Sequence, residues 1–281
     1  MAKRILTEQN IKDFALHLGR EEKSLNTIEK YIRDVKAFYT YMAGDEIVKE
    51  NVIAYKTELV SKQYAIRSIN SMLASINALF VFMGWMDLKV KSIKLQQQIY
   101  CPEENELTKA EYTRLVDTAE KEGNKRLALV LQTICGTGIR VSELQYITVE
   151  AVKKGQATVS LKGKTRTVFI VRELQKKLLR YATEQKIDSG IIFIARNKKT
   201  ISRTCIWREM KKLCQKAKVN SNKVFPHNLR HLFARTFYKI EKDIAKLADI
   251  LGHSNINTTR IYIVTTYNEH RQRMERLGLI I

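Results

Sequence analysis

Proline is scarce in this sequence, and long apolar runs are missing. Two prolines, Pro102 and Pro226, interrupt 281 residues, so the chain favours a fold rich in helices. No stretch reaches the length of about 18 uninterrupted apolar residues that a membrane-spanning helix needs. The first residues, MAKRILTEQNIKDF, also lack the apolar segment of a secretory signal peptide. We therefore expect a protein that resides in the cytoplasm.

Cysteine and acidic residues are the next deficits. The four cysteines form no CxxC pair and no Cys/His cluster with zinc-binding spacing, which argues against a zinc module and favours buried, reduced thiols. Acidic side chains number 29 against 50 lysines and arginines, a net charge of +21. So many positive side chains repel one another unless a polyanion binds, and nucleic acid is therefore the first candidate partner. Ribosomal and membrane-surface proteins share this composition.

Apolar residues at helical spacing dominate the first 95 residues. They recur in four stretches, 7–18, 24–42, 48–60 and 64–82. Each stretch carries its charges on the opposite face, which is typical of helices that pack into a small bundle. Residues 96–106 break the pattern, are polar and contain Pro102, so we predict a linker there.

A second domain is predicted over residues 107–281. Thr108 and Glu111 have the spacing of a capping box that opens a helix. Helices are expected around 108–121, 124–135, 173–185, 202–217, 228–240 and 243–251. Alternating apolar residues predict two strands, at 158–161 and 167–171. The polar, basic stretch 162–166 between them is predicted to be a hairpin turn. The predicted fold class is mainly α with a small β-sheet.

Four segments of the second domain carry side chains suited to phosphate chemistry. Breaking a phosphodiester without a metal requires a nucleophile, an acid for the leaving oxygen and fixed positive charge near the non-bridging oxygens. Arginine suits the last task, because its planar guanidinium binds two oxygens and keeps its charge. In CGTGIRVSEL, Arg140 follows a glycine-terminated helix, and Glu143 lies within a turn of it and can orient its guanidinium. A plain surface arginine is the alternative interpretation.

The second and third segments add a lysine and a His/Arg pair. In LKGKTR, a turn leaves Lys162 free to donate a proton, and Lys164 is near enough to be confused with it. Exposed hairpin lysines commonly only deter edge pairing. In FPHNLRH, His227 near a helix start and Arg230 three residues later share one face and can hold a phosphate. A structural histidine with a solvent-exposed arginine is the alternative.

The fourth segment, LGHSNINTTRIY, ends at Tyr262. Gly252 is expected to end a helix, and a small polar run then leads to the tyrosine. A phenol with its reference pKa of about 10 is a poor nucleophile at neutral pH. Only a crowded, positively charged site would make it useful, and a lone tyrosine near the end of a domain is otherwise simply packed.

In this order and at these spacings, the four segments resemble the signature of the tyrosine recombinases, the phage integrase family, and especially its Xer-like members. The step from His253 to Tyr262 is particularly diagnostic. The resemblance covers essentially the whole chain. It implies a helical, SAM-like core-binding domain at 1–95, a linker, and a tyrosine-recombinase catalytic domain at 107–281.

The resemblance also implies a role for each phosphate-binding candidate. Arg140 and Arg230 would hold the scissile phosphate of double-stranded DNA, and His253 would donate a hydrogen bond to it. Glu143 matches an acidic family position that braces Arg140. The family acts without a metal or another cofactor, and neither a carboxylate cluster nor a P-loop is evident in the sequence.

The resemblance assigns the remaining candidates to nucleophilic attack and proton transfer. Tyr262 would attack to give a 3′-phosphotyrosine, Lys162 would protonate the leaving 5′-oxygen, and His227 would assist proton transfer. The hairpin turn is shorter than the usual family form, which leaves Lys164 as the alternative lysine. Residues 238–242 also replace a stretch that usually holds smaller residues.

Assembly is implied as well. Family members act as a tetramer on two DNA sites, and the tail after Tyr262, with a predicted helix at 268–277 and an apolar end, matches a segment that protomers pass to a neighbour. Folding back on its own domain is the alternative for this tail. Two rival functions are a type IB topoisomerase, which relaxes DNA without exchanging partners, and a non-catalytic DNA-binding protein.

Overall fold

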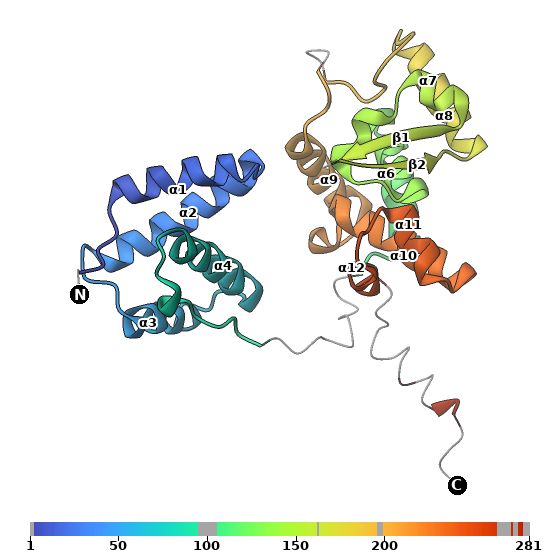
Figure 1. The fold of residues 1–281 in the computed structure, drawn as a ribbon. Helices are drawn as coiled ribbons and strands as arrows, with labels where there is room; N and C mark the ends of the chain where they lie inside the picture. Colours follow the sequence, from blue (N-terminus) through green and yellow to red (C-terminus); the bar gives the residue numbers. More distant parts are fainter. Residues whose placement is uncertain are drawn as a thin grey trace. The chain divides into compact units, whose positions relative to one another are not determined.

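The computed structural model describes residues 3–94, 106–161, 163–195, 199–262, 271 and 275–277. The chain divides into two compact units, residues 1–97 and 98–281, each with its own hydrophobic core (Figure 1). The predicted fold class is confirmed, because helices dominate the described residues and a two-stranded sheet joins them. Among these residues, no helix is long and apolar enough to cross a membrane. The predicted linker limits, 96–106, stay a prediction.

The first unit is a helical bundle. Its elements are α1 (Glu8–Arg20), α2 (Leu25–Met42), α3 (Lys49–Ser61), α4 (Ile66–Phe82) and the short 3-10 helix η1 (Met86–Leu88). The four predicted helical stretches are confirmed, and their apolar faces meet in one core. Phe14, Phe38 and Phe80 lie fully buried in this core, and the last two meet edge to face with ring centroids 6.0 Å apart. Aromatic pairs of this geometry stabilise a core beyond their buried area.

Two asparagines of α4 fasten the chain that follows the bundle. Asn77 donates from Nδ2 to the Val90 carbonyl at 2.9 Å, and its Oδ1 accepts from the Val90 amide at 3.0 Å. Asn70 repeats the pattern with Ile93 at 2.9 and 2.8 Å. Each carboxamide therefore satisfies one backbone donor and one acceptor, as a neighbouring strand would. This pairing fixes the path of the chain as it leaves the first unit.

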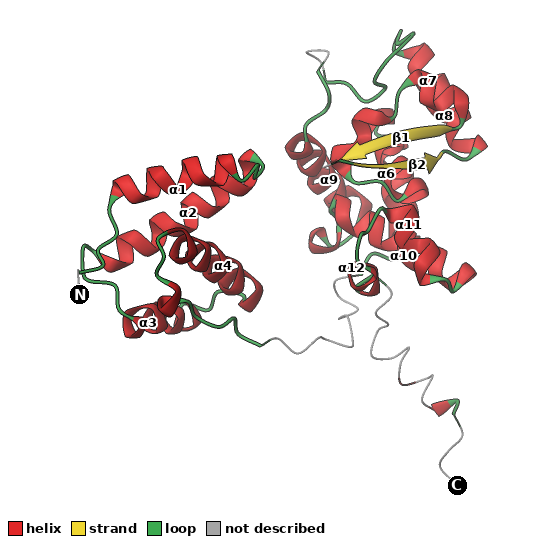
Figure 2. Ribbon diagram, in the orientation of Figure 1, coloured by secondary structure: helices red, strands yellow, loops and turns green. Residues whose placement is uncertain are grey.

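The second unit combines helices with one hairpin (Figure 2). Its elements are α5 (Lys109–Lys121), α6 (Lys125–Thr137), η3 (Val141–Tyr146), α7 (Val149–Lys154), β1 (Gln156–Leu161), β2 (Lys164–Phe169), α8 (Arg172–Glu184), α9 (Arg203–Ala217), η4 (Ser221–Lys223), α10 (Pro226–Glu241), α11 (Ile244–Leu251) and α12 (Ile256–Arg260). The capping box of Thr108 and Glu111 is confirmed. The six helices predicted between residues 108 and 251 are confirmed, whereas α7 and α12 had no counterpart in the prediction. Most of the helix predicted at 268–277 lies outside the described residues.

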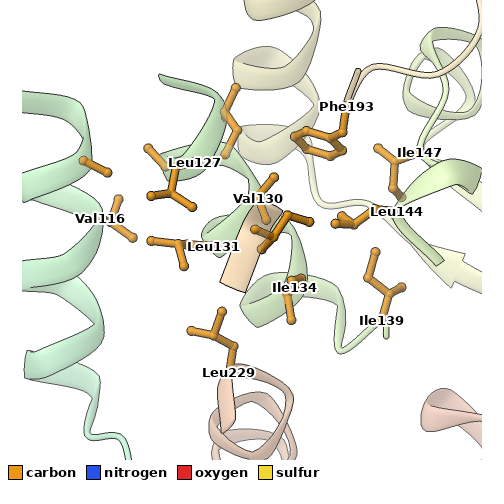
Figure 3. Packing of buried hydrophobic residues seen from close by; sticks show 14 of the residues in the cluster. Val116, Leu127, Val130, Leu131, Ile134, Ile139, Leu144, Ile147, Phe193 and Leu229 are labelled. Atoms are coloured by element: carbon orange, nitrogen blue, oxygen red, sulfur yellow. The ribbon is translucent and has the colours of Figure 1, made fainter. Parts of the chain in front are cut away.

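Helix α6 forms the centre of the second core. Figure 3 shows Val130 and Ile134 of α6 among apolar side chains from other elements, including Val116 of α5 and Leu229 of α10. Because α6 is covered from several sides, its C-terminal end is held firmly, and the chain that leaves it reaches the region described below. Truncating a single buried leucine or isoleucine of such a core to alanine costs roughly 2–5 kcal/mol of unfolding free energy.

The predicted hairpin is confirmed, but its turn is shorter than the predicted 162–166. Strands β1 and β2 pair antiparallel with Leu161 opposite Lys164, so two residues separate them. Two-residue connections match the twist of antiparallel strands, and Gly163 supplies the positive φ, +75°, that such turns need. Arg166, assigned to the turn because it is charged, instead lies within β2 opposite Val159. Lys162 lies outside the described residues.

Substitution Asn77→Ala tests the fastening of the chain after α4. It leaves the amide and carbonyl of Val90 without their partners, so we expect the first unit to lose about 1–3 kcal/mol of unfolding free energy. Trp85 is the tryptophan of the first unit and Trp207 that of the second. Thermal melts followed by Trp85 fluorescence in a Trp207→Phe background therefore report the first unit.

The matched control is Asn51→Ala, which removes one bond to the Glu46 carbonyl on the surface. It should change the unfolding free energy by less than about 0.5 kcal/mol. Equal melting temperatures for the two alanine variants would contradict the assigned role of Asn77.

Candidate active site

Arg140 lies three residues after Thr137, the last residue of α6. The helix ends at Gly138, whose φ is +67°, and a Cβ there would clash with Phe233 of α10. A side chain larger than hydrogen is therefore excluded on both steric and backbone grounds. Arg140 is the N-cap of η3, and its side chain is one-third exposed. The close packing of α6 on α10 thus sets where this arginine lies.

Glu143 binds Arg140 from within η3. Its Oε2 accepts the backbone amide of Arg140 at 2.7 Å, and its Oε1 accepts Nη1 of the same residue at 3.0 Å. The carboxylate is fully buried. Burial would raise the pKa of Glu143, but hydrogen bonds from Arg166 and Arg140 outweigh it and hold the pKa below its usual value. Glu143 is therefore ionised at neutral pH.

Arg166 also binds Glu143, and the sequence analysis missed this residue. It donates from Nη1 and Nη2 to both oxygens of Glu143, at 2.9 and 2.7 Å. Its Nε donates to the carbonyl of Ile250 near the end of α11, at 3.1 Å. Position 166 had been placed in a turn, where an exposed side chain is expected, and its true position in β2 directs it inward.

Arg230 lies on α10 and is almost completely buried, with 1% of its surface exposed. Its Nη1 donates to the Gly138 carbonyl, and its Nη2 donates to the Leu251 carbonyl at 2.6 Å. Burial, together with repulsion from Arg140, lowers the pKa of Arg230 to about 10, so the guanidinium remains charged at neutral pH. Nη1 of Arg140 reaches the same Leu251 carbonyl at 3.5 Å. The two predicted arginines are therefore brought together.

His253 follows Gly252, the residue that ends α11. Its Nε2 lies 3.0 Å from Nη2 of Arg230, and its Nδ1 lies 2.8 Å from the Thr259 hydroxyl. Since a guanidinium only donates, Nε2 accepts this bond and Nδ1 carries the proton. Burial, with repulsion from Arg230 and Arg140, lowers the pKa of His253 to about 4. The imidazole is neutral at pH 7.

Tyr262 lies directly after α12 and is buried, with 3% of its surface exposed. Its ring stacks on His253 at 5.4 Å between centroids, and His231 and His227 of α10 approach it at 4.3 and 5.5 Å. A hydrogen bond to Tyr262 also supports the charged form of Arg230. The phenol therefore lies in a crowded site with three neutral imidazoles and one charged guanidinium, that of Arg230.

His231 is the second residue that the sequence analysis missed. It lies one helical turn after His227, and the two rings meet edge to face at 4.9 Å. Burial, then the neighbouring His227, lowers the pKa of His231 to about 4, and burial, then Arg230, also lowers the pKa of His227. The four-residue spacing in HNLRH could have shown that both rings share one face of the helix.

Acid is expected to destabilise the second unit. The reference pKa of His231 and His253 is 6.5 and each is lowered to about 4 by folding, so the unfolded chain binds protons first as the pH falls. Stability should therefore be steady above about pH 7 and fall as the pH drops from about 6.5 towards 4. Thermal melts between about pH 7 and 4, followed by Trp207 fluorescence in a Trp85→Phe background, measure this loss of stability.

Two histidine variants sharpen this measurement. His231→Gln removes one titrating group and should make the fall in melting temperature shallower. His17→Gln changes a histidine of the first unit and should leave the slope of the second unit unaltered. A melting temperature that stays constant over this window would contradict a neutral, buried His231 and His253.

Two family models match the chain. The model described as "Phage integrase family" matches residues 105–269, and that described as "Phage integrase, N-terminal SAM-like domain" matches residues 11–86. Among curated proteins, tyrosine recombinase XerA of Pyrococcus furiosus is 30% identical over 289 residues, covering 100% of this chain and 98% of that protein. TnP I resolvase of Bacillus thuringiensis is 25% identical over 289 residues, covering 95% and 99%.

Solved structures share the fold. A crystal structure of XerA recombinase has a TM-score of 0.55 at 24% identity and covers 98% of this chain and 100% of that chain. A lambda integrase dimer bound to a COC′ core site has a TM-score of 0.74 at 15% identity, with 92% and 95% covered. With a family model over more than half of its length and a full-length relative at 30% identity, this chain belongs to the phage integrase family of tyrosine site-specific DNA recombinases.

Proposed function

We propose that this chain cleaves and rejoins DNA strands with Tyr262 as its nucleophile. The observation that carries the proposal is the position of the phenol, which lies among three imidazoles and is hydrogen bonded to Arg230. In the proposed step, the phenol oxygen bonds to the scissile phosphorus and the bond from phosphorus to the 5′-oxygen breaks. The products are a 3′-phosphotyrosine and a free 5′-hydroxyl.

The phosphate would bind at the two arginines. Arg140 and Arg230 are both directed to the Leu251 carbonyl, and the charge of Arg140 disfavours the charged form of Arg230. A dianionic transition state relieves this repulsion by placing negative charge between the guanidinium groups. Two positive charges near the non-bridging oxygens therefore stabilise the transition state more than the ground state.

His253 would respond to the arriving phosphate. Its Nε2 accepts a bond from Arg230 in the free protein, and the phosphate oxygens are stronger acceptors for that guanidinium. Negative charge nearby also raises an imidazole pKa. His253 then gains a proton at Nε2 and donates a hydrogen bond to the phosphate, while Thr259 continues to hold Nδ1.

Proton transfer from Tyr262 would go to an imidazole. His227 has a lowered pKa and is neutral at pH 7, so it can accept the phenolic proton as the new bond forms. Lys162, with Lys164 as the alternative, would protonate the leaving 5′-oxygen. Because the phosphotyrosine keeps the energy of the broken phosphodiester, rejoining needs no ATP. The arginines and histidines supply the positive charge that a metal ion gives in other phosphoryl transfers.

Double-stranded DNA is the proposed substrate, and a tetramer on two paired sites is the proposed assembly. The relatives include an XerH recombinase bound to its difH substrate and a lambda integrase dimer bound to DNA. The net charge of +21 suits a polyanion, so binding should weaken steeply as salt rises. We also propose the division into 1–95, a linker at 96–106 and 107–281, and a location in the cytoplasm, where the DNA lies.

Tyr262→Phe tests the nucleophile. On a nicked suicide substrate the unaltered chain should accumulate a covalent protein–DNA adduct, and Tyr262→Phe should form none, because phenylalanine has no oxygen to attack phosphorus. Tyr181→Phe is the matched control, since Tyr181 is a buried tyrosine of the same unit. Nuclease digestion and mass spectrometry should locate a nucleotide 3′-phosphate on Tyr262. Equal adduct from the native chain and Tyr262→Phe would refute the proposed nucleophile.

The same preparation separates recombination from its rivals. Selection of bound DNA sequences from a random pool gives the target site, and two copies of that site on one plasmid then report strand exchange. Exchanged products support a recombinase. Relaxed plasmid without exchange indicates a topoisomerase, and binding without any adduct indicates a non-catalytic DNA-binding protein.

Arg230→Lys tests the phosphate-binding arginines. A lysine amine cannot donate to the Gly138 and Leu251 carbonyls and still contact a phosphate, so we expect single-turnover cleavage to slow by about 100- to 1,000-fold. DNA affinity should change little, because the many other phosphate contacts remain. Quench-flow at saturating DNA gives the rate, and a wild-type rate in a variant of normal melting temperature would contradict the assignment.

A further inference from the structure

Arg166 contacts two segments that carry candidate catalytic residues. Its two terminal nitrogens bind the carboxylate of Glu143, which holds Arg140, and its Nε binds the Ile250 carbonyl three residues before His253. The side chain is 13% exposed. One strand residue therefore links the Arg140 segment to the end of α11 and to the β-hairpin.

The turn before His253 lies close against Arg166. A Cβ added to Gly252 would lie 2.7 Å from Cδ of Arg166, and the φ of Gly252 is +66°. Glycine is thus needed there for two reasons, the backbone conformation and the space that Arg166 occupies. Movement of Arg166 would displace the chain that leads to His253.

Arg166 also affects the charge balance around the Glu143 carboxylate. The Glu143 carboxylate accepts four hydrogen bonds, two from Arg140 and two from Arg166. With Arg140 as its main cationic partner, this buried anion would cancel the positive charge that a phosphate needs. The charge of Arg230 is not cancelled in this way by the carbonyls of Gly138 and Leu251 that it binds, because they are neutral.

We propose that Arg166 is a positioning residue for cleavage. It fixes Glu143, and through it Arg140, and it balances the charge of Glu143 so that the charge of Arg140 remains available to the scissile phosphate. It also holds the turn that carries His253. This inference rests on the proposed function, because it assumes that Arg140 and His253 bind the phosphate.

Arg166→Lys is the first test. Lysine keeps the charge but cannot bind both Glu143 oxygens and the Ile250 carbonyl, so Arg140 is less well placed. We expect single-turnover adduct formation at saturating DNA to slow by about 100-fold, with an unchanged Kd for DNA. A wild-type rate would overturn the proposal.

A neutral substrate separates this role from a purely structural one. A methylphosphonate at the scissile position replaces one charged non-bridging oxygen with methyl, so cleavage depends less on the charge of Arg140. The loss caused by Arg166→Lys should shrink to less than about 10-fold on this substrate. An equal loss on both substrates would overturn the proposal, because general loosening of the fold slows them alike.

Arg126→Lys is the matched control. Arg126 pairs with Glu209 at 2.7 Å in the same unit, and both side chains are largely buried. This variant should match the wild-type cleavage rate while losing similar thermal stability. If both lysine variants slow cleavage equally, the effect is one of stability and the proposal fails.

A charge-matched pair covers the case in which a single variant unfolds. Arg166→Met leaves Arg140 as the main partner of the Glu143 carboxylate, and adding Glu143→Gln removes that negative charge. The double variant should fold and should cleave at least 10-fold faster than Arg166→Met alone, and a slower double variant would overturn the charge-balancing role. Absence of adduct from the native chain would instead refute the proposed function, so the two failures can be told apart.

Discussion

Two guanidinium groups of like charge converge on one carbonyl oxygen, that of Leu251, which Arg230 binds at 2.6 Å and Arg140 reaches at 3.5 Å. Their repulsion is unfavourable in the free protein and adds to the burial that lowers the pKa of Arg230. It is tolerated because the surrounding groups are neutral or negative: carbonyls for Arg230, and the Glu143 carboxylate for Arg140. Under the proposed function, a phosphate bound between the two arginines would convert this repulsion into attraction as negative charge develops on the phosphate oxygens.

The fold supplies this arrangement from segments that are far apart in the sequence. Helix α6 ends at Gly138 against α10, so the chain that carries Arg140 and the helix that carries Arg230 are fixed relative to each other. Helix α11 contributes the Leu251 carbonyl, and the turn after it brings His253 to Arg230. Tyr262 closes the site from the end of the following short helix. The elements that carry Arg140 and Arg230 contribute Leu144 and Leu229 to the larger core, and Tyr262 itself packs with α10 and α11 in a smaller one.

Much of this was predictable from the sequence, because helical periodicity and glycine positions are local signals. Arg140 after Gly138 and the pair of His227 with Arg230 on one helix follow from such signals. Arg166 did not, because its charge and the glycine before it resemble a turn, and only the strand register shows that it points inward. His231 was also missed, and the burial of Tyr262 was considered only as the alternative to a reactive tyrosine. The helical spacing places His231 on the face of His227, but its contact with Tyr262 depends on packing between α10 and the chain after α12, which no local pattern encodes.

The central claim is that Arg140 and Arg230 bind the same phosphate with Tyr262 in line behind it. The most direct measurement is a crystal structure of the Tyr262→Phe chain with duplex DNA that contains its target site. The account predicts that both guanidinium groups and His253 contact the non-bridging oxygens of one phosphate, with the edge of the substituted ring facing its phosphorus opposite the 5′-oxygen. A scissile phosphate bound by only one of the arginines, with the other still held at the Leu251 carbonyl, would contradict it.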